Sequence, residues 1–494
     1  MSSKLLNLHF LILSIIPLLL IYSNNVHEIP PLDIIFPLTL SLVFSGMIFG
    51  VLRIKWNTQK SAVVSSILFI NFIVFGNIRS FLTNDLQFNF EYLTVALLII
   101  FLIIVISSIF FIFRKNILNE ISKIFTIFSL SLILILMPNI LFFYIDNDKE
   151  NTELFEINLD VEMSSKPDVY VVIMDEFAGE LQLASDFDYY PEKFFEELEL
   201  RDFNIPKFAF SNYPNTAYSI PSIMNMDYVD FIPEILGEES TNTLMANELA
   251  DNNNVMKMFH NNGYHVVSFY GGMGALGKSF VDQKVCAPFE INNDLKEKYL
   301  QIYVPFTNVN NQLINGTIND KLQCILENVS NTSTGDKPHV YFIHLRLPHE
   351  PFVYDANGTY NELSNYDATS KEGYLEQLKY SEKFVLKLSD MIKENNPESA
   401  ILVFSDHGFR AEIDWENRQL DNMIRGNNVI TAIHIPGENV DLPETVTLVN
   451  LFRIFFNQYL ENDFEVLDDR IMWYNPIQPN KHYDVTEEFS EYIK

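Results

Sequence analysis

The distribution of hydrophobic and polar positions divides this chain into two parts. Five long apolar runs occupy roughly residues 5–22, 34–52, 61–78, 92–113 and 124–145. Each is close to the ~20 residues that a helix needs to cross the hydrocarbon core of a bilayer. The first run follows Lys4 and has no small-residue cleavage site after it, which favours a retained helix over a signal peptide. The pattern predicts a transmembrane region with five helices over residues 1–145.

Basic residues are unevenly distributed among the loops of this region. The loops after the second and fourth runs each carry three Lys or Arg residues, whereas 24–33 and 79–91 together carry one arginine and several acids. Loops rich in Lys and Arg stay in the cytoplasm. The sequence therefore predicts a multi-pass cell-membrane protein with a cytoplasmic N-terminus and an extracytoplasmic second part.

The second part alternates in a different way. After a polar, acidic linker over 146–166, short β-branched runs appear at 168–174, 265–270, 339–345, 401–405 and 429–434. Helical patterns lie between them, at roughly 191–200, 253–262 and 373–395. Apolar strands separated by helices are typical of a parallel sheet that is covered on both faces. We expect one α/β domain over 167–494, with a mixed, mostly parallel sheet between helices.

Charge and cysteine content narrow the function classes. The whole chain has a formal charge of −31, and residues 1–145 contribute +3. The remaining residues therefore carry −34. Such an acidic domain repels nucleic acid, so a nucleic-acid partner is excluded. Cys286 and Cys324 both lie in the acidic part, where an extracytoplasmic location permits a disulfide, and two free thiols fit equally well. No Cys-x-x-Cys motif occurs, so a thiolate zinc site is set aside.

Residue types that bind metals lie at the ends of three of the predicted strands, and the third predicted strand carries His344 and leads to His349. Asp175 follows the first strand, and Asp406 and His407 follow the fourth. Functional groups of open α/β sheets gather at the carboxyl ends of strands. Together with the hydroxyl of Thr216, these side chains make an oxygen-rich set of four ligands that suits one divalent ion, Zn²⁺ or Mn²⁺. The ion would lower the pKa of the threonine and stabilise charge on a phosphoryl or sulfuryl group.

Further polar residues in these segments have two interpretations each. His349 is expected outside the ligand set, where it binds an ester oxygen or protonates a leaving group. Glu176 is either a further ligand or an exposed helix start. Arg410 either contacts a phosphate or pairs with Glu412 or Asp414.

Three more residues are candidates for substrate binding or for supporting the ligands. Asn215 either donates a hydrogen bond near Thr216 or is ordinary turn chemistry. Ser219 offers another hydroxyl, three residues after Thr216. His344 either orients a neighbouring group or sits satisfied within its strand.

These motifs carry a resemblance to a known family. Residues 167–435 resemble, in motif order, the sulfatase-type branch of the alkaline phosphatase superfamily. The layout is most similar to membrane phosphoethanolamine transferases and lipoteichoic acid synthases, which have five N-terminal spans before an outward catalytic domain. Thr-Ala-Tyr-Ser-Ile-Pro at 216–221 resembles the nucleophile segment of the transferases, which implies that Thr216 is the nucleophile and not Ser219. His344-x4-His349-x-Pro resembles their histidine loop, and Ser405-Asp-His-Gly their second metal strand.

The departures from these families also carry information. Ser219-Ile-Pro-Ser-Ile223 has the frame of the sulfatase signature but lacks its arginine, which argues against a formylglycine sulfatase. Asp175 stands where the transferases usually carry glutamate and sulfatases carry aspartate. The transferases have a further histidine a dozen residues after Asp-His-Gly, whereas here the next histidine is His434. The resemblance therefore implies a single metal ion, as in lipoteichoic acid synthases.

Taken together, the sequence predicts a metal-dependent membrane transferase. It would move a phospholipid-derived head group, of the phosphoethanolamine or phosphoglycerol type, to a surface glycan or lipid through Thr216. Its partners would be a membrane phospholipid donor and that acceptor. One alternative is a sulfatase-like hydrolase of phosphoric or sulfuric esters on extracytoplasmic glycans. Another, of a different class, is a catalytically inactive membrane scaffold.

Overall fold

The computed structural model describes most of the chain. The described residues are 7–26, 34–80, 82, 92–146, 155, 157, 159, 163, 166–269, 279–286, 307–329, 337–361, 364, 366–438, 440–460 and 462–493. They divide into two compact units, one with the N-terminal helices and one with the β-sheets.

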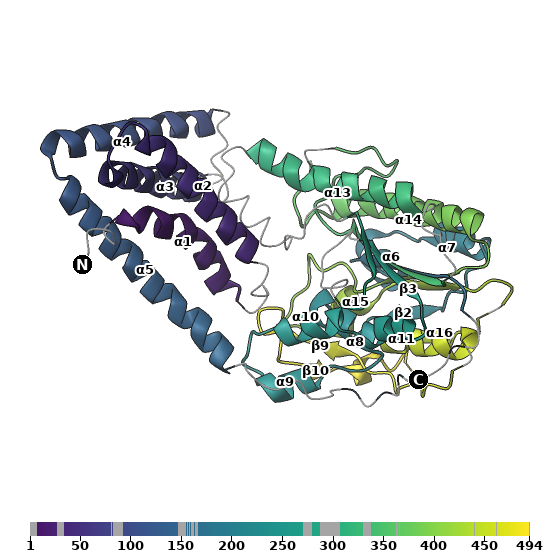
Figure 1. Ribbon diagram of the computed structural model, residues 1–494. Coiled ribbons are helices and arrows are strands. Elements are labelled where there is room, and N and C mark those ends of the chain that lie inside the picture. Colours follow the sequence, from purple (N-terminus) through teal and green to yellow (C-terminus); the bar gives the residue numbers. More distant parts are fainter. Residues whose placement is uncertain are drawn as a thin grey trace. The chain divides into compact units, whose positions relative to one another are not determined.

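Helices form at all five of the apolar runs. They are α1 (His9–Asn24), α2 (Ile35–Arg53), α3 (Thr58–Ser80), α4 (Leu93–Lys115) and α5 (Leu118–Asp146) (Figure 1). Within the described residues, three stretches are long and apolar enough to cross a membrane: Ile35–Arg53, Val95–Lys115 and Leu118–Phe142. For α1, with 16 residues, and for α3, the prediction of a span rests on the sequence pattern.

A buried polar contact joins three of these helices. His9 of α1 lies with Nδ1 2.6 Å from the hydroxyl of Ser66 on α3 and with Nε2 3.3 Å from that of Ser122 on α5. Polar groups in an apolar helix bundle stabilise it when they bond across helices. His9 therefore helps to hold the bundle together.

The second unit is built on a six-stranded sheet in the order β4-β3-β5-β1-β6-β7. Its strands are β1 (Val169–Asp175), β3 (His265–Phe269), β4 (Gln283–Val285), β5 (His339–Pro348), β6 (Ala400–Ser405) and β7 (Thr431–His434). Neighbours run parallel except for β6 and β7, which are antiparallel. The expected mixed, mostly parallel sheet is confirmed, and β4 is a strand that the sequence pattern did not indicate.

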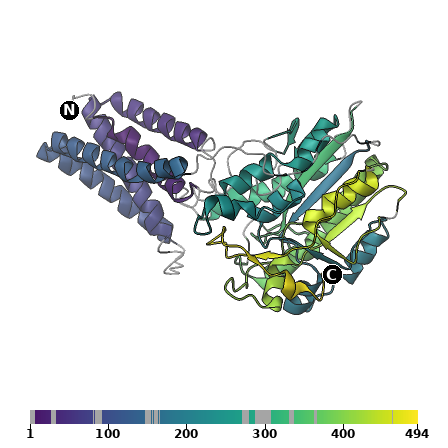
Figure 2. The same cartoon turned by 90° about the horizontal axis from the view of Figure 1, so that it is seen from below.

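Helices cover both faces of this sheet, as the continuous burial of β1 and β6 requires. Tyr170, Val172 and Met174 of β1 pack against α13 (Thr307–Val329) and α14 (Lys371–Asn395). The intervening residues, Val169, Val171 and Ile173, pack in the opposite core against α8, α11 and α16, the face seen from below in Figure 2. The helices of this second face are α8 (Thr216–Asn225), α11 (Asn254–Asn261) and α16 (Leu451–Tyr459).

Shorter elements complete the unit. The helices are α6 (Glu180–Phe187), α7 (Glu192–Glu199), α9 (Phe231–Leu236), α10 (Leu244–Asp251), α15 (Leu420–Asn427) and the 3₁₀ turns η3 (Leu448–Asn450) and η4 (Thr486–Phe489). Two small sheets pair β2 (Phe208–Phe210) with β8 (Thr445–Thr447), and β9 (Met472–Trp473) with β10 (Tyr483–Asp484).

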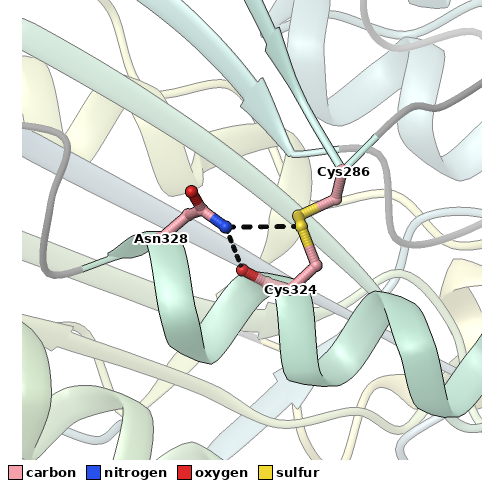
Figure 3. Close-up of a disulfide and its surroundings, with 3 residues drawn as sticks. All are labelled: Cys286, Cys324 and Asn328. Carbon is pink, nitrogen blue, oxygen red and sulfur yellow. Dashed lines mark hydrogen bonds between the residues drawn. A yellow bond between two sulfur atoms is a disulfide. The ribbon is translucent and has the colours of Figure 1, made fainter.

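A disulfide bond joins the end of β4 to α13. Cys286 and Cys324 are bonded, and the side chain of Asn328 donates to the carbonyl of Cys324 at 2.8 Å (Figure 3). The alternative of two free thiols, which the sequence left open, is therefore wrong. The bond connects residues 38 apart in the sequence and fixes α13 to the edge strand of the sheet.

Candidate metal centre and nucleophile

Two buried carboxylates meet at the carboxyl ends of neighbouring strands. Asp175 ends β1, and Asp406 directly follows β6; the two strands are paired in parallel up to Met174 and Ser405. Both aspartates are 0% exposed. Backbone amides satisfy one oxygen of Asp406, since its Oδ1 accepts from the amides of Glu176 and His407 at 3.2 and 3.0 Å. The parallel ladder therefore brings the two acids together without help from either side chain.

The imidazole of His407 faces both acids. Its Nδ1 lies 2.9 Å from the carbonyl oxygen of Gly408, so the Nδ1 proton has an acceptor and Nε2 keeps its lone pair. Nε2 lies 3.7 Å from Asp175 Oδ1 and 3.6 Å from Asp406 Oδ2. Burial and the nearby charge of Arg410 lower the pKa of His407 well below its ordinary value. The ring is thus held neutral, with its free nitrogen directed at the two carboxylates.

Gly408 makes this turn possible by its small size. A Cβ at this position would come within 2.3 Å of the carbonyl oxygen of Arg425 and 2.6 Å of Gln182 Oε1. Its amide donates to the carbonyl of Gly426 at 2.9 Å. The glycine of the Asp-His-Gly motif is therefore required by the close approach of neighbouring backbone.

The hydroxyl of Thr216 also contacts Asp406 and His407, and it comes from helix α8. Thr216 begins α8, and its Oγ donates to Asp406 Oδ2 at 2.6 Å and lies 3.0 Å from His407 Nε2. Asn215 caps the helix, because its side-chain oxygen accepts from the amide of Ala217 at 3.0 Å. The turn chemistry considered for Asn215 is thus what the structure displays.

Ser219 lies one turn further along α8. It is 0% exposed, and its hydroxyl makes no hydrogen bond to any residue that the structure describes. It shares no interaction with the two acids or with the imidazole in this described part of the chain. Thr216, by contrast, bonds directly to Asp406.

These four side chains fit a divalent cation. One ligand atom from each of Asp175, Asp406 and His407 lies within 4.8 Å of the others. Both oxygens of Asp175 are buried and have no hydrogen-bond partner among the described residues. Burial and the adjacent Asp175 carboxylate raise the pKa of Asp406, as expected for two neighbouring buried like charges. Carboxylate oxygens, a neutral imidazole and a hydroxyl suit Zn²⁺ or Mn²⁺, and the two oxygens of Asp175 without hydrogen bonds fit the role of ligands.

Glu176 and Arg410 form an ion pair beside this centre. Glu176 is 3% exposed and has a left-handed φ of 67°, and its Oε1 accepts from the amide and the Nε of Arg410 at 3.1 and 3.2 Å. The interpretation of Glu176 as an exposed helix start is wrong, because the residue lies in a buried turn before α6. Pairing of Arg410 with Glu412 or Asp414 is also wrong, since Arg410 pairs with Glu176.

His349 sits next to the acids as an imidazolium. Its amide donates to the carbonyl of Asp175 at 3.2 Å, and its Nδ1 lies 3.0 Å from Glu350 Oε2. Burial opposes a charge on the ring, but the carboxylates of Asp175 and Glu176 and the bond to Glu350 raise the pKa of His349 to about 9. The ring therefore carries a proton that a leaving group can accept.

His344 and Arg346 lie on the same side of the sheet as α8. Phe342 belongs to the core on that side, so the alternation along β5 places residues 344 and 346 there as well. His344 has a small electrostatic effect that lowers the pKa of His407, in keeping with its position on this side of the sheet. Arg346 escaped the sequence analysis, although its position two residues after His344 in a buried strand is a usable signal. Its positive charge acts on Glu350.

The profile of the family described as Sulfatase matches residues 167–454, more than half of the chain. The chain belongs to the sulfatase family. This membership agrees with the mostly parallel sheet and with the acidic, histidine-containing centre at the carboxyl ends of its strands. It supports the conclusion that the protein is an enzyme. The comparison with curated proteins found no match.

Several solved structures are similar to this sulfatase-family chain. The C-terminal periplasmic domain of EptC from Escherichia coli is 13% identical, with 65% of this chain and 93% of that one covered and a TM-score of 0.41. The integral membrane lipooligosaccharide phosphoethanolamine transferase EptA from Neisseria meningitidis is 13% identical, with 88% and 89% covered and a TM-score of 0.36. A putative sulfatase from Bacteroides thetaiotaomicron is 12% identical, with 66% and 87% covered and a TM-score of 0.38.

Proposed function

We propose that this protein is a membrane-bound transferase that moves a phospho-head group from a phospholipid to a hydroxyl of a surface glycan or lipid. The observation that carries the proposal is the position of the Thr216 hydroxyl, 2.6 Å from Asp406 and 3.0 Å from the free nitrogen of His407. A hydroxyl is a weak nucleophile until a base or a cation activates it. The sulfatase signature frame at Ser219–Ile223 lacks its arginine, which also favours phosphoryl over formylglycine chemistry.

The reaction follows from the contacts of Thr216. When a phosphodiester lies against the centre, Oγ of Thr216 forms a bond to phosphorus, and its proton leaves along the hydrogen bond to Asp406 Oδ2. The phosphorus–oxygen bond to the diacylglycerol breaks, and His349 donates its proton to the departing oxygen. An acceptor hydroxyl then attacks phosphorus, gives its proton to His349 and releases Thr216, which regains its proton from Asp406. A cation held by Asp175, Asp406, His407 and Thr216 would supply charge stabilisation for the transferring group.

Arg410 supports an anionic substrate at this place. Its Nε is bound to Glu176, but the side chain remains 21% exposed and its guanidinium has further donors. Guanidinium groups bind phosphate oxygens through paired hydrogen bonds. We assign Arg410 to the phosphate of the donor lipid, with Glu176 holding the arginine in place.

The N-terminal helices and the disulfide support the cellular setting. Helices that cross the membrane would keep the centre close to lipid donors and so raise their effective concentration. The bond between Cys286 and Cys324 suits an oxidising, extracytoplasmic compartment. We therefore propose a cytoplasmic N-terminus, as the loop charges predict, and a catalytic domain on the outer side.

Intact-mass analysis of the full chain incubated with mixed phospholipids and Mn²⁺ or Zn²⁺ tests the proposal. We expect a covalent adduct on the peptide with Thr216, whose mass names the head group. Thr216→Ala should lose the adduct and reduce turnover by at least about a thousandfold, since it removes the nucleophile itself. Normal turnover by Thr216→Ala would refute the assignment.

Membership of the sulfatase family favours a second candidate, a hydrolase of phosphate or sulfate esters on glycans. The two functions differ in what attacks the Thr216 intermediate. Release of free head group in the presence of an excess of acceptor hydroxyls would identify a hydrolase. Transfer to the acceptor, with little release to water, would identify the transferase.

A further inference from the structure

Tyr474 is a buried tyrosine with an unexplained hydroxyl. It directly follows β9, beyond residue 454 where the family match ends. The side chain is 1% exposed, and its hydroxyl has no hydrogen-bond partner in the described part of the chain. A buried hydroxyl without a partner costs free energy, and native structures rarely keep one without a reason.

Two contacts fix this tyrosine against the nucleophile helix. Its ring meets that of Tyr218 edge-on, with the centroids 5.2 Å apart, and Tyr218 lies two residues after Thr216 on α8. The amide of Met472 donates to the carbonyl of Asn212 at 2.8 Å, which ties β9 to the loop before Thr216. The segment after the family domain therefore packs against the helix that carries Thr216 and the loop before it.

Among the tyrosines of this cluster, the neighbours of Tyr474 have hydrogen-bond partners for their hydroxyls. Its neighbour Tyr218 donates to Asn480 at 2.7 Å, and Tyr213 in the same cluster donates to Asp230 at 2.8 Å. These two aromatic neighbours have protein acceptors, whereas Tyr474 does not.

Charged groups of the candidate site also act on the hydroxyl of Tyr474. Burial and the neighbouring Tyr218 raise the pKa of its phenol well above the ordinary value of 10.0, and the charges of Arg410 and Asp406 make smaller contributions of opposite sign. The phenol therefore keeps its proton at neutral pH and is available as a donor. Arg410 and Asp406 belong to the loop that begins with the Asp-His-Gly motif.

We propose that the Tyr474 hydroxyl donates a hydrogen bond to an oxygen of the tetrahedral phosphate group that is transferred through Thr216. This deepens the proposed function and rests on it for the identity of the transferred group. Donors that are fixed in place before the reaction stabilise oxygens on which charge develops, and they do so strongly in sites that exclude water. Tyr474 would make this contact from the C-terminal segment, and Arg410 from the loop after β6.

The test uses the full chain with Mn²⁺ or Zn²⁺ and the variant Tyr474→Phe, which removes only the hydroxyl. We expect an unchanged or higher unfolding temperature, at least tenfold weaker binding of inorganic phosphate, and formation of the Thr216 adduct slowed about a hundredfold. The matched control is Tyr264→Phe, because Tyr264 is similarly buried but donates to the carbonyl of Pro167, just before β1, at 2.9 Å. It should unfold at a lower temperature and bind phosphate normally.

The outcomes separate this proposal from the transferase itself. Phosphate binding and adduct formation by Tyr474→Phe at the wild-type level would overturn the role of Tyr474 and leave the transferase intact. If this variant binds phosphate more weakly and the wild type forms no Thr216 adduct, the result would support Tyr474 as a hydrogen-bond donor to phosphate. The same result would refute the transferase. A wild-type chain that neither binds phosphate nor forms the adduct would refute both.

Discussion

The residues at the centre of this site are individually unfavourable and collectively suited to one task. Asp175 buries two carboxylate oxygens without a hydrogen bond to the residues described, and Asp406 lies beside it. Buried charges are costly unless they are paired. The same two acids, with a neutral imidazole and a hydroxyl, make a cation site. The stability of the protein and its metal binding are therefore opposed at this point.

Replacing Asp175 with asparagine tests this opposition. Asp175→Asn removes one of two adjacent buried carboxylates. The free energy of unfolding in EDTA should therefore rise by about 1–3 kcal/mol, and the unfolding temperature with it. Added Zn²⁺ or Mn²⁺ should stabilise the wild type, by about 2.7 kcal/mol at one hundred times its Kd, and leave the variant unchanged. Thermal unfolding with and without metal measures both effects.

Asp186→Asn is the matched control, since Asp186 is similarly buried but paired with Arg425 at 3.0 Å. Its loss should destabilise the protein and preserve the response to metal. A lower unfolding temperature of metal-free Asp175→Asn would show that the attraction of Asp175 to His349 and Arg410 outweighs its repulsion from Asp406.

Glu382 on α14 gives a pH dependence that is independent of the metal centre. The residue is 8% exposed, Tyr189 donates to its carboxyl group at 2.9 Å, and burial raises the pKa of Glu382 to about 7. Between the ordinary pKa of ~4.3 and that value, the folded state holds a proton that the unfolded state lacks. Its contribution to stability is complete below this window and is lost as the pH rises through about 7.

Glu382→Gln keeps a neutral acceptor for Tyr189 and removes the titration. Between pH 4.5 and 7.5, the wild type should lose on the order of 3 kcal/mol of unfolding free energy that the variant keeps. Chemical unfolding at several pH values measures this difference. Glu199→Gln, an exposed change on α7, should run parallel to wild type. Parallel curves for Glu382→Gln as well would contradict the assignment.

At the scale of helices and strands, the sequence predicted what depends on local pattern. The β-branched runs became β1, β3, β5, β6 and β7, and the motif residues followed the strands as expected. Helix α13 was missed because its sequence is rich in asparagine, although Ile318, Leu322, Ile325 and Val329 repeat at helical spacing.

Pairings across long sequence separations could not be predicted. Glu176 and Arg410 are 234 residues apart, and neither sequence neighbourhood indicates the other. Tyr474 belongs to no motif, and its relevance depends on where β9 packs. Composition left the state of the two cysteines open, because both a thiol pair and a disulfide are compatible with it.

The disulfide is the element-scale feature whose removal is easiest to measure. It closes a loop of 38 residues, which corresponds to about 4 kcal/mol of lost entropy in the unfolded chain. We expect the double variant Cys286→Ala/Cys324→Ala to unfold at a lower temperature than wild type by this order of free energy. A reducing agent should lower the wild-type unfolding temperature and leave the double variant unaffected. Equal sensitivity of both to the reductant would contradict the bond.

At the scale of the whole molecule, charge is concentrated in the second part of the chain. Residues 146–494 carry a formal charge of −34, against +3 for the first 145. A catalytic domain of this charge is repelled by an anionic lipid surface and is indifferent to a zwitterionic one. Under the proposed function, this distinction favours a zwitterionic head group over an anionic one as the donor.

Head-group release from vesicles of two compositions tests this expectation. With phosphatidylglycerol-rich vesicles, turnover should rise as salt increases from about 0.01 to 0.15 M, because the screening length falls from about 30 to 8 Å. With vesicles of phosphatidylethanolamine and phosphatidylcholine, turnover should be nearly constant. A fall in turnover with salt on anionic vesicles would show that local basic groups, such as Arg410, outweigh the total charge.

The register of the two central strands has a consequence for how this enzyme can change. Because Met174 and Ser405 are paired in the ladder, the acids that follow them are placed by backbone geometry shared with the whole sheet. The groups proposed to meet substrate, Arg410 and Tyr474, come from segments outside that ladder. Evolution or laboratory selection can therefore exchange the donor preference by altering these outer segments, while the inherited centre stays as it is.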